Sequence, residues 1–144
     1  MFKPNLIIQE IWQTVNANAT LQGADYLTTT GRVWNGRKPE QTDNPIVVIS
    51  GSRVVSETQS ERYNLMFTAY ADNFENGTPD IARLGNIIGE VSNTLHNNSA
   101  ITITGGRISS IFTTENTGVL FDGEHEEEHY QSLLLTLFAV DFTT

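Results

Sequence analysis

Residues 45–95 read PIVVISGSRVVSETQSERYNLMFTAYADNFENGTPDIARLGNIIGEVSNTL and contain two strand patterns followed by a helix pattern. The run at 46–49 is wholly apolar, and in the second pattern Tyr63, Leu65, Phe67 and Ala69 alternate with Arg62, Asn64, Met66 and Thr68. This period of two is typical of a strand with one buried face. A helix opening at Thr78, Pro79 and Asp80 then carries an apolar stripe of Ile81, Leu84, Ile88, Val91 and Leu95. We expect this stripe to pack on the sheet.

The remaining sequence predicts one more helix and further strands. A helix beginning near Pro4 carries on one side Ile8, Ile11, Trp12, Val15 and Ala19. Residues 23–44 predict an irregular segment with at most a short strand at 32–34. Asn97 and Asn98 favour a helix stop, and residues 101–114 predict a hairpin with Gly105 and Gly106 as its two turn residues. Residues 116–129 predict a loop with a short apolar piece at 119–121, and 130–142 predict the final strand.

Together these elements predict an α+β fold over residues 1–144 as a single domain. We expect a small, antiparallel-rich sheet with two helices packed on one face and a protruding hairpin between strands at 46–55 and 61–71. A chain of 144 residues can bury a sufficient core without disulfide bonds. The absence of cysteine excludes a disulfide framework, a thiolate metal site and a cysteine nucleophile, and fits a reducing cytoplasm. We expect neither a signal peptide nor a membrane span.

The charge balance argues against a nucleic-acid reader. The chain has 8 basic and 17 acidic residues and a formal net charge of −9, whereas affinity for a polyanion depends on cations that displace counterions from phosphates. One small basic cluster, Arg32, Arg37 and Lys38, lies beside Trp34 in the irregular segment. Two interpretations remain open for it, a solvated loop and a loop that docks a partner.

The final predicted strand is apolar on both faces. One face carries Leu133, Leu135, Leu137 and Ala139, and the other carries Leu134, Phe138, Val140 and Phe142. Since two helices cover only one face of a sheet, the second face needs another cover. We expect Leu134, Phe138, Val140 and Phe142 to form an interface between subunits. The alternative is that the loops at 23–44 and 116–128 fold over them.

Residues 125–129 read HEEEH and match the zinc-hydrolase motif H-E-x-x-H in letters. That chemistry needs a helix, which directs both imidazoles at one metal ion and the glutamate at its bound water. Here His125, Glu126 and His129 follow Asp122-Gly123 and lead into a strand, and a third ligand would have to be His96 or a carboxylate. A solvated acidic loop is the favoured interpretation, with structural metal binding and zinc catalysis as alternatives. No nucleophile elbow, phosphate-binding loop or dinucleotide fingerprint is present, so we expect no enzyme activity and no cofactor.

The order of elements resembles the tail terminator, or tail-to-head joining, proteins that complete the tails of long-tailed bacteriophages. The resemblance begins with Asn44 and Pro45, which introduce the strand opening at 46–50. It continues through a polar hairpin tip and the alternating strand that ends at 67–72 with an aromatic and an acidic residue. The helix at 80–95, the glycine-turn hairpin at 101–112, a polar loop and the last strand complete the pattern.

The resemblance implies a structural protein that forms a six-fold ring, a homohexamer, at the head-proximal end of the tail tube. Such a ring stops tube growth and joins the tail to the head. Its implied partners are further copies of itself, the tail tube protein and a head completion or connector protein, and DNA passes through the lumen without specific binding. It implies assembly in the host cytoplasm and a place in the virion tail, with no membrane contact.

Polar loops are the expected surfaces for partners or for the lumen of such a ring. The candidate residues are Arg37, Lys38, Glu57, Glu61, Glu124, Glu126, Glu127 and Glu128. An acidic inner surface would repel passing DNA. The alternatives are another head–tail connector or tube-like ring protein, a zinc hydrolase using His125, Glu126 and His129, and a small-ligand or polyanion-binding module.

Overall fold

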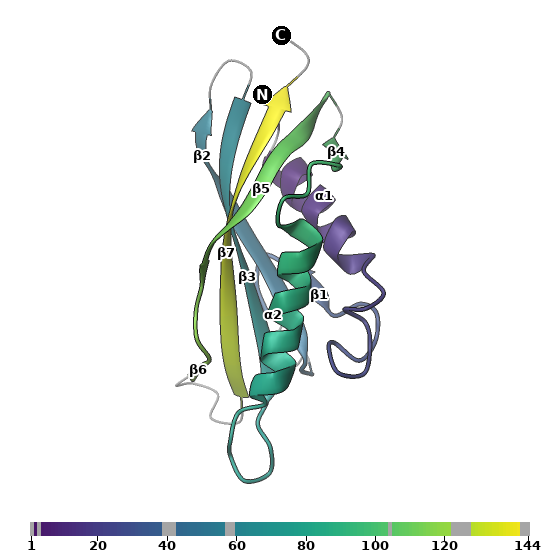
Figure 1. Cartoon of the computed structure of the whole chain (residues 1–144), viewed down its shortest axis with the longest axis vertical. Helices are drawn as coiled ribbons and strands as arrows, with labels where there is room; N and C mark the ends of the chain where they lie inside the picture. The colour runs from purple at the N-terminus through teal and green to yellow at the C-terminus, as the bar shows by residue number, and fades with distance from the viewer. Residues whose placement is uncertain are drawn as a thin grey trace.

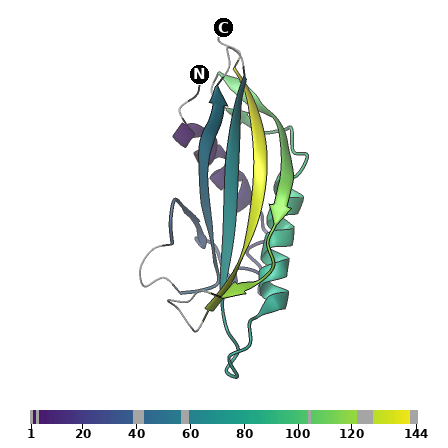
Figure 2. The same cartoon turned by 90° about the vertical axis from the view of Figure 1, so that its left-hand side faces the viewer.

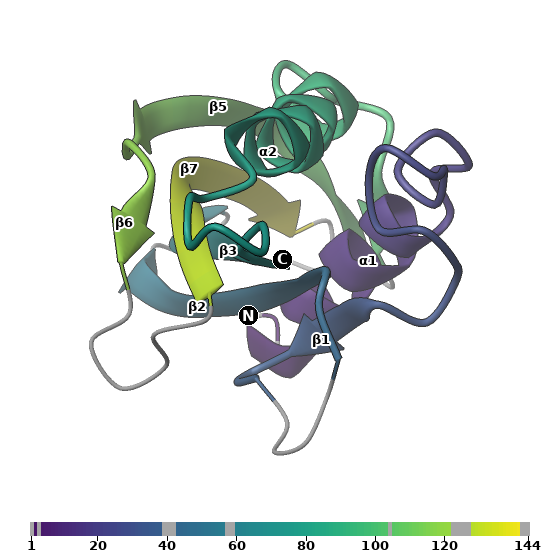
Figure 3. The same ribbon diagram turned by 90° about the horizontal axis from the view of Figure 1, so that it is seen from below.

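The computed structural model describes residues 2, 4–38, 43–56, 60–103, 105–121 and 128–141. It contains two helices and a curled, mostly antiparallel sheet, with both helices on one face of the sheet (Figures 1 and 3). The elements in chain order are α1 Pro4–Asn16, β1 Val33–Asn35, β2 Ile46–Ser56, β3 Ser60–Asp72, α2 Ile81–Leu95, β4 Thr102–Ile103, β5 Gly106–Asn116, β6 Leu120–Phe121 and β7 Glu128–Asp141. The predicted α+β class is therefore confirmed, with both helices on one face.

Strand β7, the last in the sequence, lies in the middle of the sheet. The order is β1-β2-β3-β7-β5-β4, and β6 pairs with β7 outside this path. β7 runs antiparallel to β3 from Ser60↔Val140 to Asp72↔Glu128 and antiparallel to β5 on its other side. β1 is parallel to β2, so the sheet is mixed at that edge. Figure 2 shows the four long strands side by side, with the helices behind them.

The core lies between the helices and the inner face of the sheet. β3 and β7 contribute to it the buried residues Tyr63, Leu65, Phe67, Ala69, Leu133, Leu135, Leu137 and Ala139. The helices contribute Ile7, Ile8, Ile11, Val15, Leu84, Ile87, Ile88, Val91 and Leu95. Each large aliphatic side chain buried in this way stabilises the fold by roughly 1.5–3 kcal/mol. The alternation seen in the sequence is the pattern of this buried face.

The helices differ from the sequence prediction at their ends. α1 ends at Asn16, so Ala19 lies in the following turn and is exposed. α2 begins at Ile81, with the carboxylate of Asp80 accepting the backbone N–H of Arg83 at 3.2 Å as its N-cap. Ile81 was predicted in the buried stripe but is 60% exposed. The stripe is buried only from Leu84 onward, where the helix lies over β3 and β7.

Two predicted turns were partly right. Asn97 ends the second helix in the left-handed conformation, with φ 59°, as predicted. In the β4–β5 hairpin Gly105 has φ 84°, but Gly106 is the first residue of β5 rather than a second turn residue. A side chain at Gly106 would overlap the backbone of Val140 and the ring of Phe2. Glycine is therefore required at position 106 by close packing and not by the turn.

Two glycines provide a matched test of this packing. Gly106→Ala is expected to lower the free energy of unfolding by roughly 1–3 kcal/mol, because the new methyl group overlaps a neighbouring backbone. Gly89→Ala, on α2 with nothing within 4 Å of the new carbon, is expected to raise it by about 0.5–1 kcal/mol. Urea unfolding of both variants measures the two changes, and equal effects of the same sign would contradict the argument.

Candidate functional site

The sheet face opposite the helices, named here the open face, carries apolar side chains that the helices do not cover. Register pairs across β3 and β7 place Met66 beside Leu134 and Arg62 beside Phe138 on this face. Met66 is 41% exposed, and Leu134, Phe138 and Val140 are half-buried. The ring of Phe138 stacks on that of exposed Phe112 from β5, with centroids 5.9 Å apart. Phe142, the fourth predicted interface residue, lies outside the described residues.

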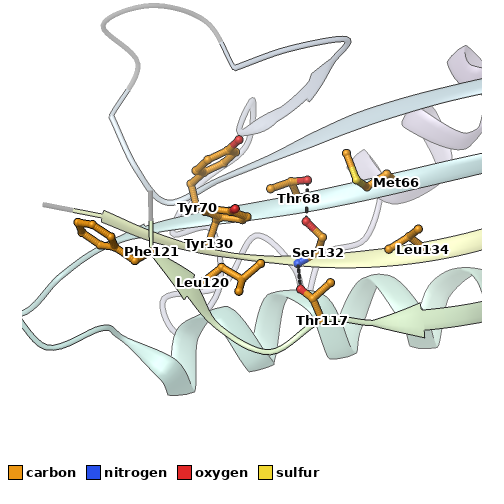
Figure 4. Close-up of a pocket in the computed structure, with 9 residues that line it drawn as sticks. All are labelled: Met66, Thr68, Tyr70, Thr117, Leu120, Phe121, Tyr130, Ser132 and Leu134. Atoms are coloured by element: carbon orange, nitrogen blue, oxygen red, sulfur yellow. Dashed lines mark hydrogen bonds between the residues drawn. The ribbon is translucent and has the colours of Figure 1, made fainter. Parts of the chain in front are cut away.

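A groove of about 520 Å³ lies on the open face where β6 pairs with β7 (Figure 4). Its lining is Met66, Thr68, Tyr70, Thr117, Leu120, Phe121, Tyr130, Ser132 and Leu134. The rings of Tyr70 and Tyr130 lie 5.8 Å apart at one end, and the aliphatic side chains of Met66 and Leu134 lie at the other. The groove is therefore a wide surface hollow whose lining mixes apolar and polar side chains.

Three polar residues of the groove, Thr68, Ser132 and Thr117, are hydrogen-bonded to one another. The hydroxyls of Thr68 and Ser132 lie 3.0 Å apart, and the Ser132 backbone N–H donates to Thr117 Oγ1 at 3.0 Å (Figure 4). The described histidines bond elsewhere: His129 Nδ1 lies 2.6 Å from Asn73 Oδ1, and His96 Nδ1 accepts the backbone N–H of Thr113 at 3.0 Å. Ser132 thus has a threonine partner and not the adjacent base that nucleophilic catalysis needs.

The zinc-like motif lies only partly in the described structure. His125 and Glu126 are outside it, and His129 belongs to strand β7 rather than to a helix. Among the described residues, no three histidine, cysteine, aspartate or glutamate side chains are grouped as metal ligands would be. No helix within the described ranges has the length and apolar character needed to cross a bilayer.

Glu128 was predicted in an exposed loop, but the structure makes it the first residue of β7 with only 2% of its surface exposed. Its Oε2 accepts from Lys38 Nζ at 2.5 Å and from Asn44 Nδ2 at 2.6 Å. Lys38 Nζ also lies 4.7 Å from the centre of the Tyr70 ring. These contacts hold the segment before β2 against the end of the open face. Arg37, by contrast, is exposed as predicted.

Glu61 is the second acidic residue that the structure buries instead of exposing. It lies in β3 opposite Ala139, on the helix side of the sheet, and is 2% exposed. Its carboxylate accepts the backbone N–H of Phe2 at 2.9 Å and the hydroxyl of Tyr63, and lies 3.8 Å from Arg53. The remaining acidic candidates, Glu57, Glu124, Glu126 and Glu127, lie outside the described residues.

The open face was only half predicted from the sequence. The residues of the final strand were found because both of its faces are apolar. Met66 was counted among the polar positions of its strand, and Phe112 and the two groove tyrosines were not singled out. The available signal was that Met66, Phe112 and Leu134 share a face once β7 is placed between β3 and β5. That placement joins strands far apart in the sequence and is not a local pattern.

Comparison with known proteins yields a likeness of fold. No protein-family model matches the chain, and no curated protein matches its sequence. Among solved structures, a chain of the "Virion of native gene transfer agent (GTA) particle" superposes with a TM-score of 0.72 at 12% sequence identity. The match covers 94% of this chain and 96% of that chain. The chain therefore shares its fold, over nearly its whole length, with a component of a virion.

The contact between Lys38 and Glu128 is expected to contribute to stability. Lys38→Ala leaves a buried carboxylate without its cation and should lower the free energy of unfolding by roughly 1–3 kcal/mol. Glu128→Gln keeps the side-chain shape but removes the charge. In that background, Lys38→Ala should lower the free energy of unfolding by clearly less. A double-mutant cycle by urea unfolding gives the coupling, and additive single effects would contradict the ion-pair interpretation.

The raised pKa of Tyr63 predicts that the fold loses stability at alkaline pH. Burial raises the pKa of Tyr63 above its ordinary value near 10, and the hydrogen bond and negative charge of Glu61 raise it further. The unfolded chain therefore loses this proton first, and stability should fall as the pH rises above about 10, by up to about 1.4 kcal/mol per pH unit. Urea midpoints between pH 8 and 11 measure the decline. Tyr63→Phe should show a shallower decline, and an unchanged slope would contradict this assignment.

Proposed function

We propose that this chain is a structural protein of a virion, which forms a ring at the head-proximal end of a tail tube, ends tube growth and joins the tail to the head. The observation that carries the virion role is the shared fold with a virion chain over 94% of the sequence. The order of elements, which resembles that of tail terminator proteins, supports the position within the tail. Its partners are further copies of the chain, six in the expected ring, together with the tube protein and a head completion or connector protein.

The open face supports contact between copies. A ring closes through heterologous contacts, in which one patch of a subunit meets a different patch of the next. Met66 and Phe112 are exposed, and Leu134, Phe138 and Val140 are partly so, on a face that lacks helices. Contact with a neighbouring copy would remove this surface from water. Once one subunit of a ring engages the tube end, the other subunits bind at high effective concentration, so weak single contacts suffice.

The charge fits a ring through which DNA passes without being held. A formal net charge of −9 disfavours a stable complex with a polyanion. The segment at 124–128 contains four glutamates, of which only Glu128 lies in the described structure, where it is buried and paired. The proposal therefore relies on the overall charge rather than on Glu128 for an acidic lumen.

Mass measurement in solution, with and without purified tail tubes, tests this function, followed by imaging of the tubes. A ring-sized species and decoration at one tube end are the expected results. Incorporation along the whole tube would instead indicate a tube-like ring protein. A chain that neither assembles nor binds tubes would refute the proposal.

Substitutions on the open face are expected to separate folding from assembly. Leu134→Asn should weaken association between copies about tenfold or more, since loss of one buried leucine at an interface costs roughly 1.5–3 kcal/mol. Ile81→Asn is the matched control, because Ile81 is an exposed apolar residue on α2 rather than on the open face. Sedimentation measures assembly, and circular dichroism checks that both variants fold. Equal weakening by both substitutions would argue against the open face as the interface.

A further inference from the structure

The outer edge of β2 has backbone groups that bond to nothing among the described residues. The N–H of Val47 donates to the carbonyl of Arg32 at 3.0 Å, and the carbonyl of Ile49 accepts the N–H of Gly36 at 2.7 Å. Residues 47 and 49 therefore point their amide groups outward, away from β3. Because alternate residues of a strand share this direction, Gly51 and Arg53 also point theirs outward. β1 pairs only as far as Ile49, and no described backbone or side chain bonds to these groups of Gly51 and Arg53.

At the opposite edge of the sheet, by contrast, outward backbone groups of β5 are hydrogen-bonded. On the outer side of β5, the N–H of Thr113 donates to His96 Nδ1 at 3.0 Å, and the carbonyl of Ile111 accepts the N–H of Asn97 at 2.8 Å. The N–H of Ile108 donates to the carbonyl of Ile101 at 3.0 Å. Proteins commonly protect strand edges in this way, because a free edge templates pairing with another chain. The β2 edge lacks such protection at Gly51 and Arg53.

There is room for a strand beside this edge. A hollow of about 420 Å³ lies where β1 ends, lined by Asn5, Ile8, Asn35, Gly36, Ser50 and Gly51. The chain leaves the edge at Gly36, which has φ 98°. Figure 2 shows β1 beside only the lower part of β2, with the upper part at the rim of the sheet. Ser50, Gly51 and Ser52 have small side chains, which allow another backbone to approach closely.

A second hollow connects this edge with the open face. It has a volume of about 330 Å³ and is lined by Ser50, Gly51, Ser52, Asn64, Leu65, Met66 and Leu134. Met66 and Leu134 belong to the surface proposed above as a contact between copies. A segment paired with the β2 edge would therefore lie next to that contact. One neighbouring molecule could occupy both surfaces.

We propose that the edge of β2 at Gly51 and Arg53 pairs with an extended segment of a second copy of this chain, adding a strand in line with β1. The inference rests on the proposed ring and names one of its contacts. The charges support this occupant, because the partly exposed Arg53 lies on this edge and a second copy carries a formal net charge of −9. The register shift after Arg53 ends the regular edge, so the added strand is short. Main-chain hydrogen bonds supply the recognition, as in other cases of strand addition.

Two variants at one position separate backbone pairing from side-chain effects. Arg53→Pro removes an outward N–H that bonds to nothing within the described chain, and proline is tolerated at such strand-edge positions. Arg53→Ala keeps that N–H but loses the same charge and the contact with Glu61. Association between copies, measured by sedimentation, should be about tenfold weaker for Arg53→Pro than for Arg53→Ala. Equal association of the two variants would overturn the proposal.

Hydrogen exchange of the unaltered chain gives a second measurement that does not depend on how the variants fold. The amide of Gly51 should exchange at least about tenfold more slowly in the assembled form than in the dilute monomer. Ring formation with fast exchange at Gly51 would refute the edge contact and leave the ring intact. If the Gly51 amide exchanges slowly only in single copies bound to tubes, the edge pairs with the tube protein and not with a second copy. That result would overturn this inference. A chain that stays monomeric with and without tubes would refute both proposals.

Discussion

The pairing of β7 between β3 and β5 is the interaction on which the rest of the structure depends. It joins the end of the sequence to its middle along the full length of both neighbours, from Ser60↔Val140 to Asp72↔Glu128 on the β3 side. This pairing fixes which residues of β7 face the helices. A shift of one residue would turn Leu133, Leu135 and Leu137 away from the core and expose them. The core and the open face are therefore set by a single register.

That register also explains which parts of the molecule the sequence could predict. Local periodicity located both helices and the long strands, because each has one buried side repeated at a regular spacing. Glu61, at the start of a predicted strand, and Glu128, in a predicted loop, were expected to be exposed, since charged residues are rarely buried without a partner. Their partners are distant in the sequence: Phe2 and Arg53 for Glu61, Lys38 and Asn44 for Glu128. Such pairs arise from tertiary contact and leave no local pattern.

The two ends of the open face differ in how they are covered. At the end near Glu128, Lys38 and Asn44 hold a loop against the sheet, and β6 pairs with β7 through Leu120 and Phe121. Toward the middle, Met66 and Phe112 remain exposed beside half-buried Leu134 and Phe138. The surface left for another molecule is thus the middle of the face, reaching the β2 edge.

The proposed ring needs a contact between copies that differs from a symmetric pair. An isologous dimer would need one patch that meets itself, whereas a ring needs two different patches on different sides of the subunit. The sheet provides this asymmetry, because the β5 edge is closed by His96, Asn97 and Ile101 while the β2 edge is free at Gly51 and Arg53. The β2 edge could also pair with the same edge of a second copy, so the proposed ring requires this edge to receive a different segment of its neighbour. In the proposed ring, copies joined in this way would point in one direction, and a constant rotation between them would close the ring.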